Sequence, residues 1–532
     1  MSAPESDETG AGAPPTAAGG GLTAQAASGL SWSSVSTMAL VVANLAYTAT
    51  VSRLLDPTAF GLVAMANLVV LFGQYFARMG LASALVQKAS LSDDEIRAAS
   101  TAGILIGLGC TGLVWLVAPA VGSLFHSQEL VPVLRGLGLS FLFVGWSMTG
   151  VGLLLRGLRF RARSMVSVAA YVVGYLVVGV GLALLGAGVW SLVAAAVSST
   201  VIQAAWQYAL VRHPVRPVLR WQPYRSVCGY GTQLSVAHVL DYLGGNLDTF
   251  TVARIADAAV VGQYSRGYYL VFQPLSNYLS ATLNTVVFAT LSRLQDDLPR
   301  LRRGYLSVAS LGALLVFPLC AGMAVAAPEL VAVVLGPQWG PVTGLIPWFA
   351  AAGGCHVVSQ LAQSLAEARA ELNRSVAVQV AYLVALAVLI MLALPFRSRG
   401  VWVIGAAVAT AEALRYLGYL ALVHRVLGLP GARLWRAHYP AAFASAGVAV
   451  MVAAVGRLLT ETPSFVVLVA EIATGTVALG LCIRLCPVPA VRADLWGRLE
   501  SGGLLGSPDG RRWSLAILAL GPQDGTSLEV RP

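Results

Sequence analysis

The sequence predicts an all-α polytopic membrane protein, and its composition, its long apolar runs and its few charges all indicate this. Hydrophobic residues make up 57% of the 532 residues and charged residues only 11%, and the mean hydropathy is +0.74. Run after run reaches about 18 nearly uncharged residues, the length that crosses about 30 Å of hydrocarbon as a helix. These runs are continuously apolar and do not alternate, which excludes a transmembrane β-barrel.

About fourteen transmembrane helices are expected between two polar ends. Residues 1–29 are rich in Gly, Ala, Pro and acidic residues, and we expect a disordered cytoplasmic leader. No basic segment precedes the first apolar run, so we expect no cleavable signal peptide. Residues 484–532 are expected to form a loosely ordered cytoplasmic tail. The expected helices span 30–52, 59–86, 99–122, 132–155, 165–185, 189–211, 227–250, 259–291, 305–327, 341–366, 376–395, 401–423, 439–459 and 465–483.

The loops between these helices carry unequal numbers of basic residues. If the N-terminus is cytoplasmic, the inner loops hold 19 Lys and Arg residues and the outer loops hold five. Cytoplasmic loops are the basic ones in membrane proteins, so we expect both termini in the cytoplasm. The net charge of +10 then reflects this orientation, and no nucleic-acid partner is expected.

The loops and the cysteines argue against an enzyme and against a metal protein. No expected loop reaches 20 residues, whereas a membrane glycosyltransferase, polymerase or ligase would usually need a folded extramembrane portion to hold its acceptor. The six cysteines are scattered and form no Cys-x-x-Cys pair, so neither a metal site nor a disulfide framework is expected.

A short motif occurs twice at a fixed distance. Residues 47–61 read YTATVSRLLDPTAFG and residues 248–262 read DTFTVARIADAAVVG; they share the pattern T-x-T-V-x-R-x2-D-x4-G at an offset of 201 residues. The offset spans six expected helices, an even number, so the two copies have the same orientation. The chain is therefore expected to contain two parallel six-helix lobes, 30–211 and 227–423, followed by two helices in 439–483.

Each copy of the motif contains an arginine and, three positions later, an aspartate: Arg53 with Asp56, and Arg254 with Asp257. Asp56 precedes Pro57, which suits a turn followed by a helix start. We expect these pairs to shape or latch turns at the outer surface. A role in closing an outer gate and a purely turn-stabilising role both stay open.

Charged residues inside the expected spans indicate a polar interior. An unpaired charge at the bilayer centre costs about 2.5–3.5 kcal/mol on insertion scales, so such residues usually face a cavity or a partner. Arg78, Asp241, Asp248 and Arg266 lie on the helices that flank the repeated motif. Because arginine donates paired hydrogen bonds to phosphate, Arg78 and Arg266 are candidates to bind an anionic substrate, beside a purely structural ion-pair role.

The segments around these charges are unusually polar. Residues 227–250 carry Gln, His, Asp and Asn side chains along their length, and such a helix is stable in a membrane only where it lines water or protein. Gln263 and Tyr264, close to Arg266, offer hydrogen bonds suited to sugar and phosphate groups. His238 and Asp241 have the spacing of a proton relay, although a packed, hydrogen-bonded histidine explains them as well.

Further charged and titratable groups are expected to have structural roles. Glu412 and Arg415 lie three positions apart on one expected helix and are expected to neutralise each other. Arg135, near a helix start, is expected to extend to the membrane surface. His356 is a weaker candidate for proton chemistry than His238.

Several blocks resemble the polysaccharide-biosynthesis flippases, the Wzx-type exporters of O-antigen or colanic-acid-like glycans within the multidrug/oligosaccharidyl-lipid/polysaccharide superfamily. The resemblance runs in the expected order from about residue 28 to residue 375 and fades beyond it. The similar blocks are SRLLDPTAFGLVAMANLVVLFGQYFARMGLASALVQ, LRFRARS, GAGVWSLVAA, LDTFTVARIADAAVVGQYSRGYYLVFQPLSNYL and VVFATLSRLQ.

The resemblance implies two six-helix lobes in a V around a central cavity, often with two extra helices. It implies a protein of the bacterial cytoplasmic membrane that moves an undecaprenyl-pyrophosphate-linked oligosaccharide to the outer leaflet by alternating access. Cavity arginines would hold the pyrophosphate, which implies that role for Arg78 and Arg266, with Asp248 as a cation or proton site. No cofactor is implied beyond coupling to H⁺ or Na⁺. The implied partners are the lipid-linked substrate, the bilayer, a glycan polymerase and other assembly proteins.

Three other functions stay open. A drug or metabolite antiporter of the same fold would need a coupling carboxylate and an apolar or acidic cavity, which the arginines disfavour. A membrane glycan polymerase or ligase would need an extracytoplasmic catalytic loop, and the expected loops contain none. A non-transporting scaffold of a glycan-assembly complex has only the tail from residue 484 in its favour.

Overall fold

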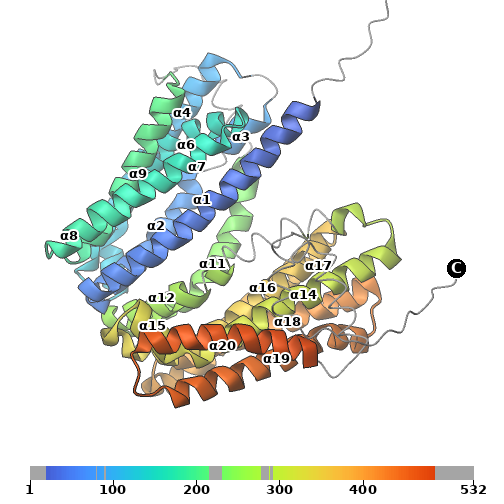
Figure 1. Ribbon diagram of the computed structural model, residues 1–532. Helices are drawn as coiled ribbons and strands as arrows, with labels where there is room; N and C mark the ends of the chain where they lie inside the picture. Colours follow the sequence, from blue (N-terminus) through green and yellow to red (C-terminus); the bar gives the residue numbers. More distant parts are fainter. Residues whose placement is uncertain are drawn as a thin grey trace, which may run out of the picture. The chain divides into compact units, whose positions relative to one another are not determined.

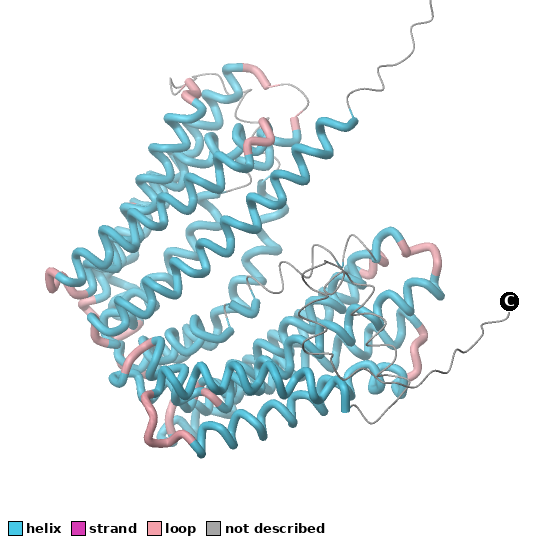
Figure 2. The backbone as a smooth tube through the Cα atoms, in the orientation of Figure 1, coloured by secondary structure: helices cyan, strands magenta, loops and turns pink. Residues whose placement is uncertain are grey.

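The protein is described by a computed structural model, in which each of two compact units is a bundle of helices. Within the described residues every regular element is a helix (Figures 1 and 2). The units are Met1–Ser265 and Arg266–Pro532. Most of the expected tail, and the start of the expected leader, lie outside the described residues. The described residues are 19–78, 81–88, 91–214, 231–272, 274–276, 287 and 291–485.

Helix starts in the first unit follow local capping chemistry. Ser92 accepts a hydrogen bond from the Glu95 backbone N–H at 3.3 Å, and Glu95 accepts one from the Ser92 N–H at 3.1 Å, a reciprocal cap. Pro57 opens α2, where its missing N–H costs nothing. The elements are α1 Gly19–Leu54, α2 Pro57–Arg78, α3 Leu81–Gln87, α4 Asp93–Leu124, α5 Leu130–Gly138, α6 Ser140–Arg156, α7 Phe160–Tyr171, η1 Val172–Gly179, α8 Val180–Leu184, α9 Val189–Val211, α11 Gly231–Ile255 and α12 Ala258–Gly267.

The second unit begins within the last turn of α12. The Asp297 side chain caps α14 by accepting from the Arg300 N–H at 3.0 Å. The elements are η2 Tyr268–Phe272, α14 Leu298–Val325, α15 Ala327–Val334, η4 Pro337–Gly344, α16 Ile346–Ala368, α17 Leu372–Ala393, η5 Leu394–Arg399, α18 Trp402–Leu427, α19 Gly431–Leu458 and α20 Ser464–Leu485.

Most of the expected membrane spans coincide with helices of the structure. Eleven helical stretches among the described residues are long and apolar enough to cross a membrane, and η4 with α16, bent by 55°, forms a twelfth if the pair is one span. The two remaining expected spans are 227–250, which overlaps the polar α11, and 259–291, which begins as α12 and η2 and continues partly outside the described residues. The total of fourteen and the two-lobe layout stay predictions.

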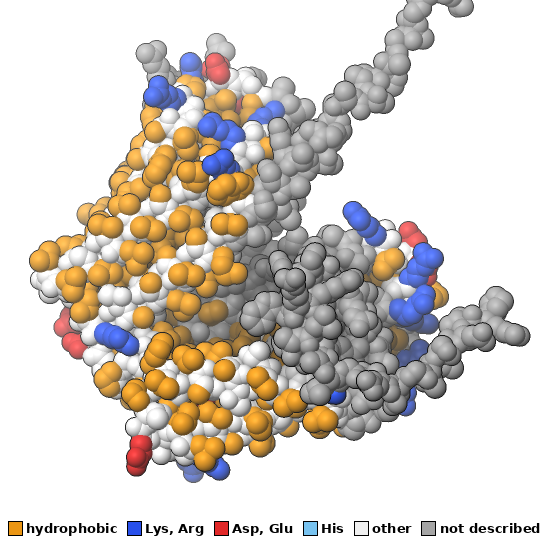
Figure 3. Space-filling view, in the orientation of Figure 1, with side chains coloured by type: hydrophobic (Ala, Val, Ile, Leu, Met, Phe, Trp, Pro, Cys, Tyr) orange, Lys and Arg blue, Asp and Glu red, His pale blue; other side chains and the backbone are white. Residues whose placement is uncertain are grey.

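The outward faces of the helices are apolar. Leu116, Met391 and Val450 keep 78%, 70% and 67% of their surface exposed, and hydrophobic side chains are spread over the whole described face in Figure 3, with few charged ones among them. Soluble proteins rarely expose such an extent of apolar surface. Together with the long spans, this surface is that of a multi-span membrane protein.

Small residues allow helices of the first unit to approach closely. A Cβ atom built on Gly103 of α4 would lie 2.3 Å from the Gly145 carbonyl oxygen of α6, and one on Gly145 would lie 2.0 Å from the Gly103 oxygen. The two backbones are therefore in direct contact, a packing that small residues make available in membranes.

The two units share a second set of local structures, at an offset of 212 residues. The turn after α6 has Leu158 in the left-handed region (φ 51°), and the turn after α16 has Ala370 there (φ 56°). Both turns close with the same backbone hydrogen bonds: Arg159 N to Leu154 O at 2.9 Å, and Glu371 N to Ala366 O at 2.8 Å. Left-handed non-glycine residues are uncommon, so this coincidence is informative.

The starts of α9 and α18 repeat at the same offset. Gly188 (φ 55°) and Gly400 (φ 118°) each precede a Val-Trp pair at the helix start. In each unit the two equivalent helices pack together, α6 against α9 and α16 against α18. This second correspondence supports the internal repeat and indicates an insertion of 11 residues (212 minus 201) after the first motif.

Candidate functional site

The two copies of the repeated motif meet within the first unit. A Cβ atom on Gly61 of α2 would lie 1.7 Å from the Ala258 carbonyl oxygen, and one on Gly262 of α12 would lie 1.9 Å from the Pro57 oxygen. Ala258 and Pro57 are themselves equivalent at the offset of 201. The contact is therefore reciprocal, and only glycine fits at either of the two equivalent positions.

The aspartates of the motif begin helices, and the arginines have different surroundings. Asp257 Oδ1 accepts from the Val260 N–H at 2.9 Å, which caps α12. Arg254 Nη1 lies 3.1 Å from His126 Nδ1, and no ion pair joins it to Asp257 in the part of the chain described. Arg53 and Asp56 are both exposed. The gate role of these four residues stays a prediction.

Of the six predicted substrate-binding residues, Asp248 and Tyr264 are brought together. The Tyr264 hydroxyl donates to Asp248 Oδ2 at 2.7 Å, and the two side chains are 0% and 4% exposed, respectively. On the same helix as Asp248, the Tyr242 hydroxyl donates to the Leu68 carbonyl of α2. These contacts join α11 to α2 and to α12.

The other four predicted residues are placed less fully. Arg266 is half-buried, and its guanidinium carbon lies 5.3 Å from the ring centroid of Tyr269. Gln263 is half-buried in α12. Arg78 is the last residue of α2 and Asp241 lies in α11, but their side chains, like that of His238, lie outside the description.

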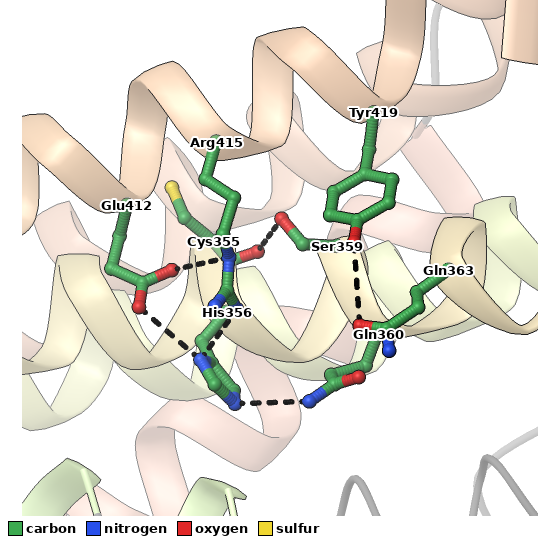
Figure 4. Close-up of polar contacts among 8 residues, drawn as sticks. All are labelled: Cys355, His356, Ser359, Gln360, Gln363, Glu412, Arg415 and Tyr419. Carbon is green, nitrogen blue, oxygen red and sulfur yellow. Dashed lines mark hydrogen bonds and ion pairs between the residues drawn. The ribbon is translucent and has the colours of Figure 1, made fainter. Parts of the chain in front are cut away.

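A buried charged network lies between α16 and α18 of the second unit, and we call its members His356, Glu412 and Arg415 the triad (Figure 4). Arg415 Nε lies 3.1 Å from Glu412 Oε2, so the expected neutralising pair is confirmed. His356 Nδ1 lies 2.6 Å from Arg415 Nη2 and 3.2 Å from Glu412 Oε1. The three side chains are 16%, 2% and 6% exposed, in the order named.

Neutral polar and aromatic groups surround the triad. Gln360 Nε2 lies 3.4 Å from His356 Nε2, and the Arg415 guanidinium carbon lies 4.9 Å from the ring centroid of Tyr382 in α17. One turn further along, the Tyr419 hydroxyl donates to Gln363 Oε1 at 3.4 Å, also visible in Figure 4. The arrangement is able to hold a proton or to present an arginine N–H to an anion.

The first unit shows that the fold does not require these charges. At the offset of 212, His356, Glu412 and Arg415 correspond to Val144, Thr200 and Gln203. α6 and α9 pack together as α16 and α18 do, with those uncharged residues at the equivalent positions. The triad is therefore a feature of one half of the repeat, which favours a functional role over a structural one.

Sequence reasoning found the ion pair of the triad and ranked its histidine low. Glu412 and Arg415 are three apart on one helix, whereas His356 precedes Glu412 by 56 residues and joins it only through the packing of α16 on α18. A comparison of the two halves at the offset of 212 would have shown that all three positions are uncharged in the first half.

Comparison with known proteins places the chain in a family. The model of the family described as "Polysaccharide biosynthesis protein" matches residues 50–343, which is 294 of the 532 residues. The chain is 23% identical over 354 residues to the lipopolysaccharide biosynthesis protein WzxC of Escherichia coli K12, covering 65% of this chain and 71% of the relative. It is 23% identical over 325 residues to the teichuronic acid biosynthesis protein TuaB of Bacillus subtilis, covering 60% and 66%.

A further relative and two solved structures agree with this placement. The succinoglycan biosynthesis transport protein ExoT of Rhizobium meliloti is 26% identical over 298 residues, covering 56% of this chain and 60% of the relative. The lipid II flippase MurJ in an inward closed conformation superposes with a TM-score of 0.67 at 12% identity, covering 84% of this chain and 97% of MurJ. An inward-facing multidrug resistance MATE family transporter superposes with a TM-score of 0.56 at 16% identity, covering 73% and 94%.

The match over more than half of the chain and the superpositions lead to one conclusion. The chain belongs to the polysaccharide biosynthesis protein family and is a multi-span membrane protein with the fold of the multidrug/oligosaccharidyl-lipid/polysaccharide transporters.

Proposed function

We propose that this protein is a flippase that moves a lipid-linked oligosaccharide across the bacterial cytoplasmic membrane during surface polysaccharide synthesis. The family match over residues 50–343 carries the proposal. The relatives WzxC, TuaB and ExoT are named for lipopolysaccharide, teichuronic acid and succinoglycan biosynthesis, three different glycans. A step common to such pathways is the passage of a glycan precursor across the membrane, and the fold shared with the lipid II flippase supports that step.

The carrier we propose is undecaprenyl pyrophosphate, bound in alternating access by Arg78 and Arg266. Arg266 supports this role because its guanidinium lies beside the Tyr269 ring, 5.3 Å from the centroid. A guanidinium held against an aromatic ring keeps N–H groups at its edge, and that edge matches two phosphate oxygens. Asp248, Asp241, Gln263 and Tyr264 are proposed to contribute hydrogen bonds to the same substrate or to a coupling cation.

A second candidate is a cation-coupled drug or metabolite antiporter, which the likeness to a MATE family transporter favours at the level of fold alone. The two proposals differ in what a deletion strain loses. Loss of an antiporter increases drug sensitivity and leaves the surface glycan intact, whereas loss of the flippase removes the glycan and leaves drug sensitivity unchanged.

The test is deletion of the gene, followed by complementation with variants. We expect deletion to abolish the surface polysaccharide and lipid-linked intermediates to accumulate in the inner leaflet. Arg266→Ala should lower export at least about tenfold at normal protein level, since charge-assisted hydrogen bonds contribute about 1.5–3 kcal/mol. Arg457→Ala, at an exposed arginine near the end of α19, is the matched control and should restore export fully. Unchanged surface glycan without accumulated intermediate in the deletion strain would overturn the proposal.

A further inference from the structure

His356 Nδ1 lies between two groups that it cannot bind at the same time. Arg415 Nη2, at 2.6 Å, is always a donor and needs a lone pair on Nδ1. Glu412 Oε1, at 3.2 Å, is an acceptor when ionised and needs a proton on Nδ1. The distances in the structure fit the first arrangement, a neutral imidazole that accepts from the arginine and carries its proton on Nε2.

We propose that His356 is a proton-binding site and that proton binding exchanges its partner from Arg415 to Glu412. A proton added to Nδ1 makes this atom a donor to Glu412 Oε1, so Arg415 Nη2 loses its acceptor and turns away. The link from Arg415 Nε to Glu412 Oε2, at 3.1 Å, remains and keeps the arginine attached. The released Nη2 is then free to donate to water or to an anionic group.

The groups around the imidazole accommodate both states. The Gln360 amide, 3.4 Å from Nε2, accepts through its oxygen in either state after a flip of the amide. The Phe272 ring of η2 lies edge-on, with centroids 5.1 Å apart, and α14 brings the neutral Cys320 and Phe317 against the neighbouring Gly354. The Tyr382 hydroxyphenyl group of α17 faces the arginine. Among the described residues, the charged groups that act on His356 are Glu412 and Arg415, both from α18.

Proton binding changes the charge of a buried site, and this links it to conformation. With a neutral His356 the triad has no net charge; with a protonated His356 its net charge is +1. A net charge in a dry membrane interior costs several kcal/mol, so the protonated triad favours a conformation in which water or an anion reaches it. The conformation described here, with Glu412 and Arg415 almost fully buried, is the one that the neutral triad favours.

A role of this proton in transport rests on the proposed function. Proton binding by His356 does not, and it is tested without measuring transport. The full chain, with its six histidines labelled with nitrogen-15, is titrated in lipid nanodiscs by NMR, and the His356 signal is assigned by its loss in His356→Gln. We expect this signal to change from a neutral imidazole with Nε2–H to the doubly protonated form between about pH 8 and pH 5. In Glu412→Gln it should stay neutral over that range, because the carboxylate that accepts from Nδ1–H is gone.

His438→Gln is the matched control. His438 is also buried in a span, with Nδ1 2.8 Å from the Leu434 carbonyl oxygen of its own helix, and its loss should leave the His356 titration unchanged. A His356 signal that stays neutral at about pH 5, or that titrates alike in wild type and Glu412→Gln, would overturn the inference.

A transport assay separates the two proposals. Proteoliposomes carry a fluorescent undecaprenyl-pyrophosphate-linked disaccharide, and translocation is measured with and without an imposed pH gradient. The gradient should change the rate several-fold in wild type and His438→Gln, and should have no effect in His356→Gln. A full gradient response in His356→Gln would overturn the transport role of the proton. No translocation by wild type would overturn the proposed function, and the NMR titration would still decide proton binding.

Discussion

At the scale of single residues, the triad illustrates why a buried charge is informative. Glu412 and Arg415 are 2% and 6% exposed and neutralise each other at 3.1 Å, so neither residue can be changed alone without leaving the other charge uncompensated. The first unit has Val144, Thr200 and Gln203 at the equivalent positions and packs without charges. The protein thus contains an uncharged version of the same helix contact.

This comparison predicts opposite results for two variants. Glu412→Ala should destabilise the protein by about 3–5 kcal/mol, because Arg415 stays buried without its partner. The triple variant His356→Val, Glu412→Thr, Arg415→Gln, which copies the first unit, should keep near-wild-type stability and lose export. Thermal and denaturant unfolding of the purified protein measure stability, and the amount of surface glycan measures export. A Glu412→Ala protein as stable as wild type would contradict the structural pairing.

At the scale of elements, the spans could be predicted from the sequence, but the contacts between them could not. The lengths of apolar runs predicted most helices because crossing the bilayer imposes that length. Nothing in a hydropathy pattern distinguishes the break between η4 and α16, bent by 55°, from a straight span. Likewise, the polar α11 predicted a protein or water environment, but that Asp248 meets Tyr264 depends on how α11 packs on α12.

The reciprocal glycine contact between α2 and α12 gives the prediction at this scale. Gly61→Ala and Gly262→Ala should each destabilise the protein by about 1–3 kcal/mol or more, since the added Cβ atoms would lie 1.7 Å and 1.9 Å from backbone oxygens. Gly109→Ala is the control, because its Cβ meets nothing within 4 Å, and it should stabilise α4 slightly. Unfolding temperature and export are measured for all three. Equal stability of the Gly61 and Gly109 variants would show that this helix contact does not hold the two motifs together.

At the scale of the whole molecule, two offsets support one internal duplication. The motif at offset 201 and the turns at offset 212 agree on the direction of the repeat. The second half has 11 more residues than the first between the motif and the turns. The two halves differ in the charges that they carry at equivalent positions. Among the described residues the triad lies in the second half, and Val144, Thr200 and Gln203 stand at the equivalent positions of the first.

The orientation in the membrane is the last prediction. The expected inner loops hold 19 basic residues and the expected outer loops hold five, which predicts that the turn before α19 lies inside the cell and the turn after it outside. α19 has 28 residues and spans about 42 Å, so its two ends must lie on opposite sides of the bilayer. In a background without the six native cysteines, a membrane-impermeant maleimide should label Glu461→Cys in intact cells and Ala432→Cys only after permeabilisation. The converse pattern would reverse the orientation of every span, and with it the leaflet from which the substrate is proposed to enter.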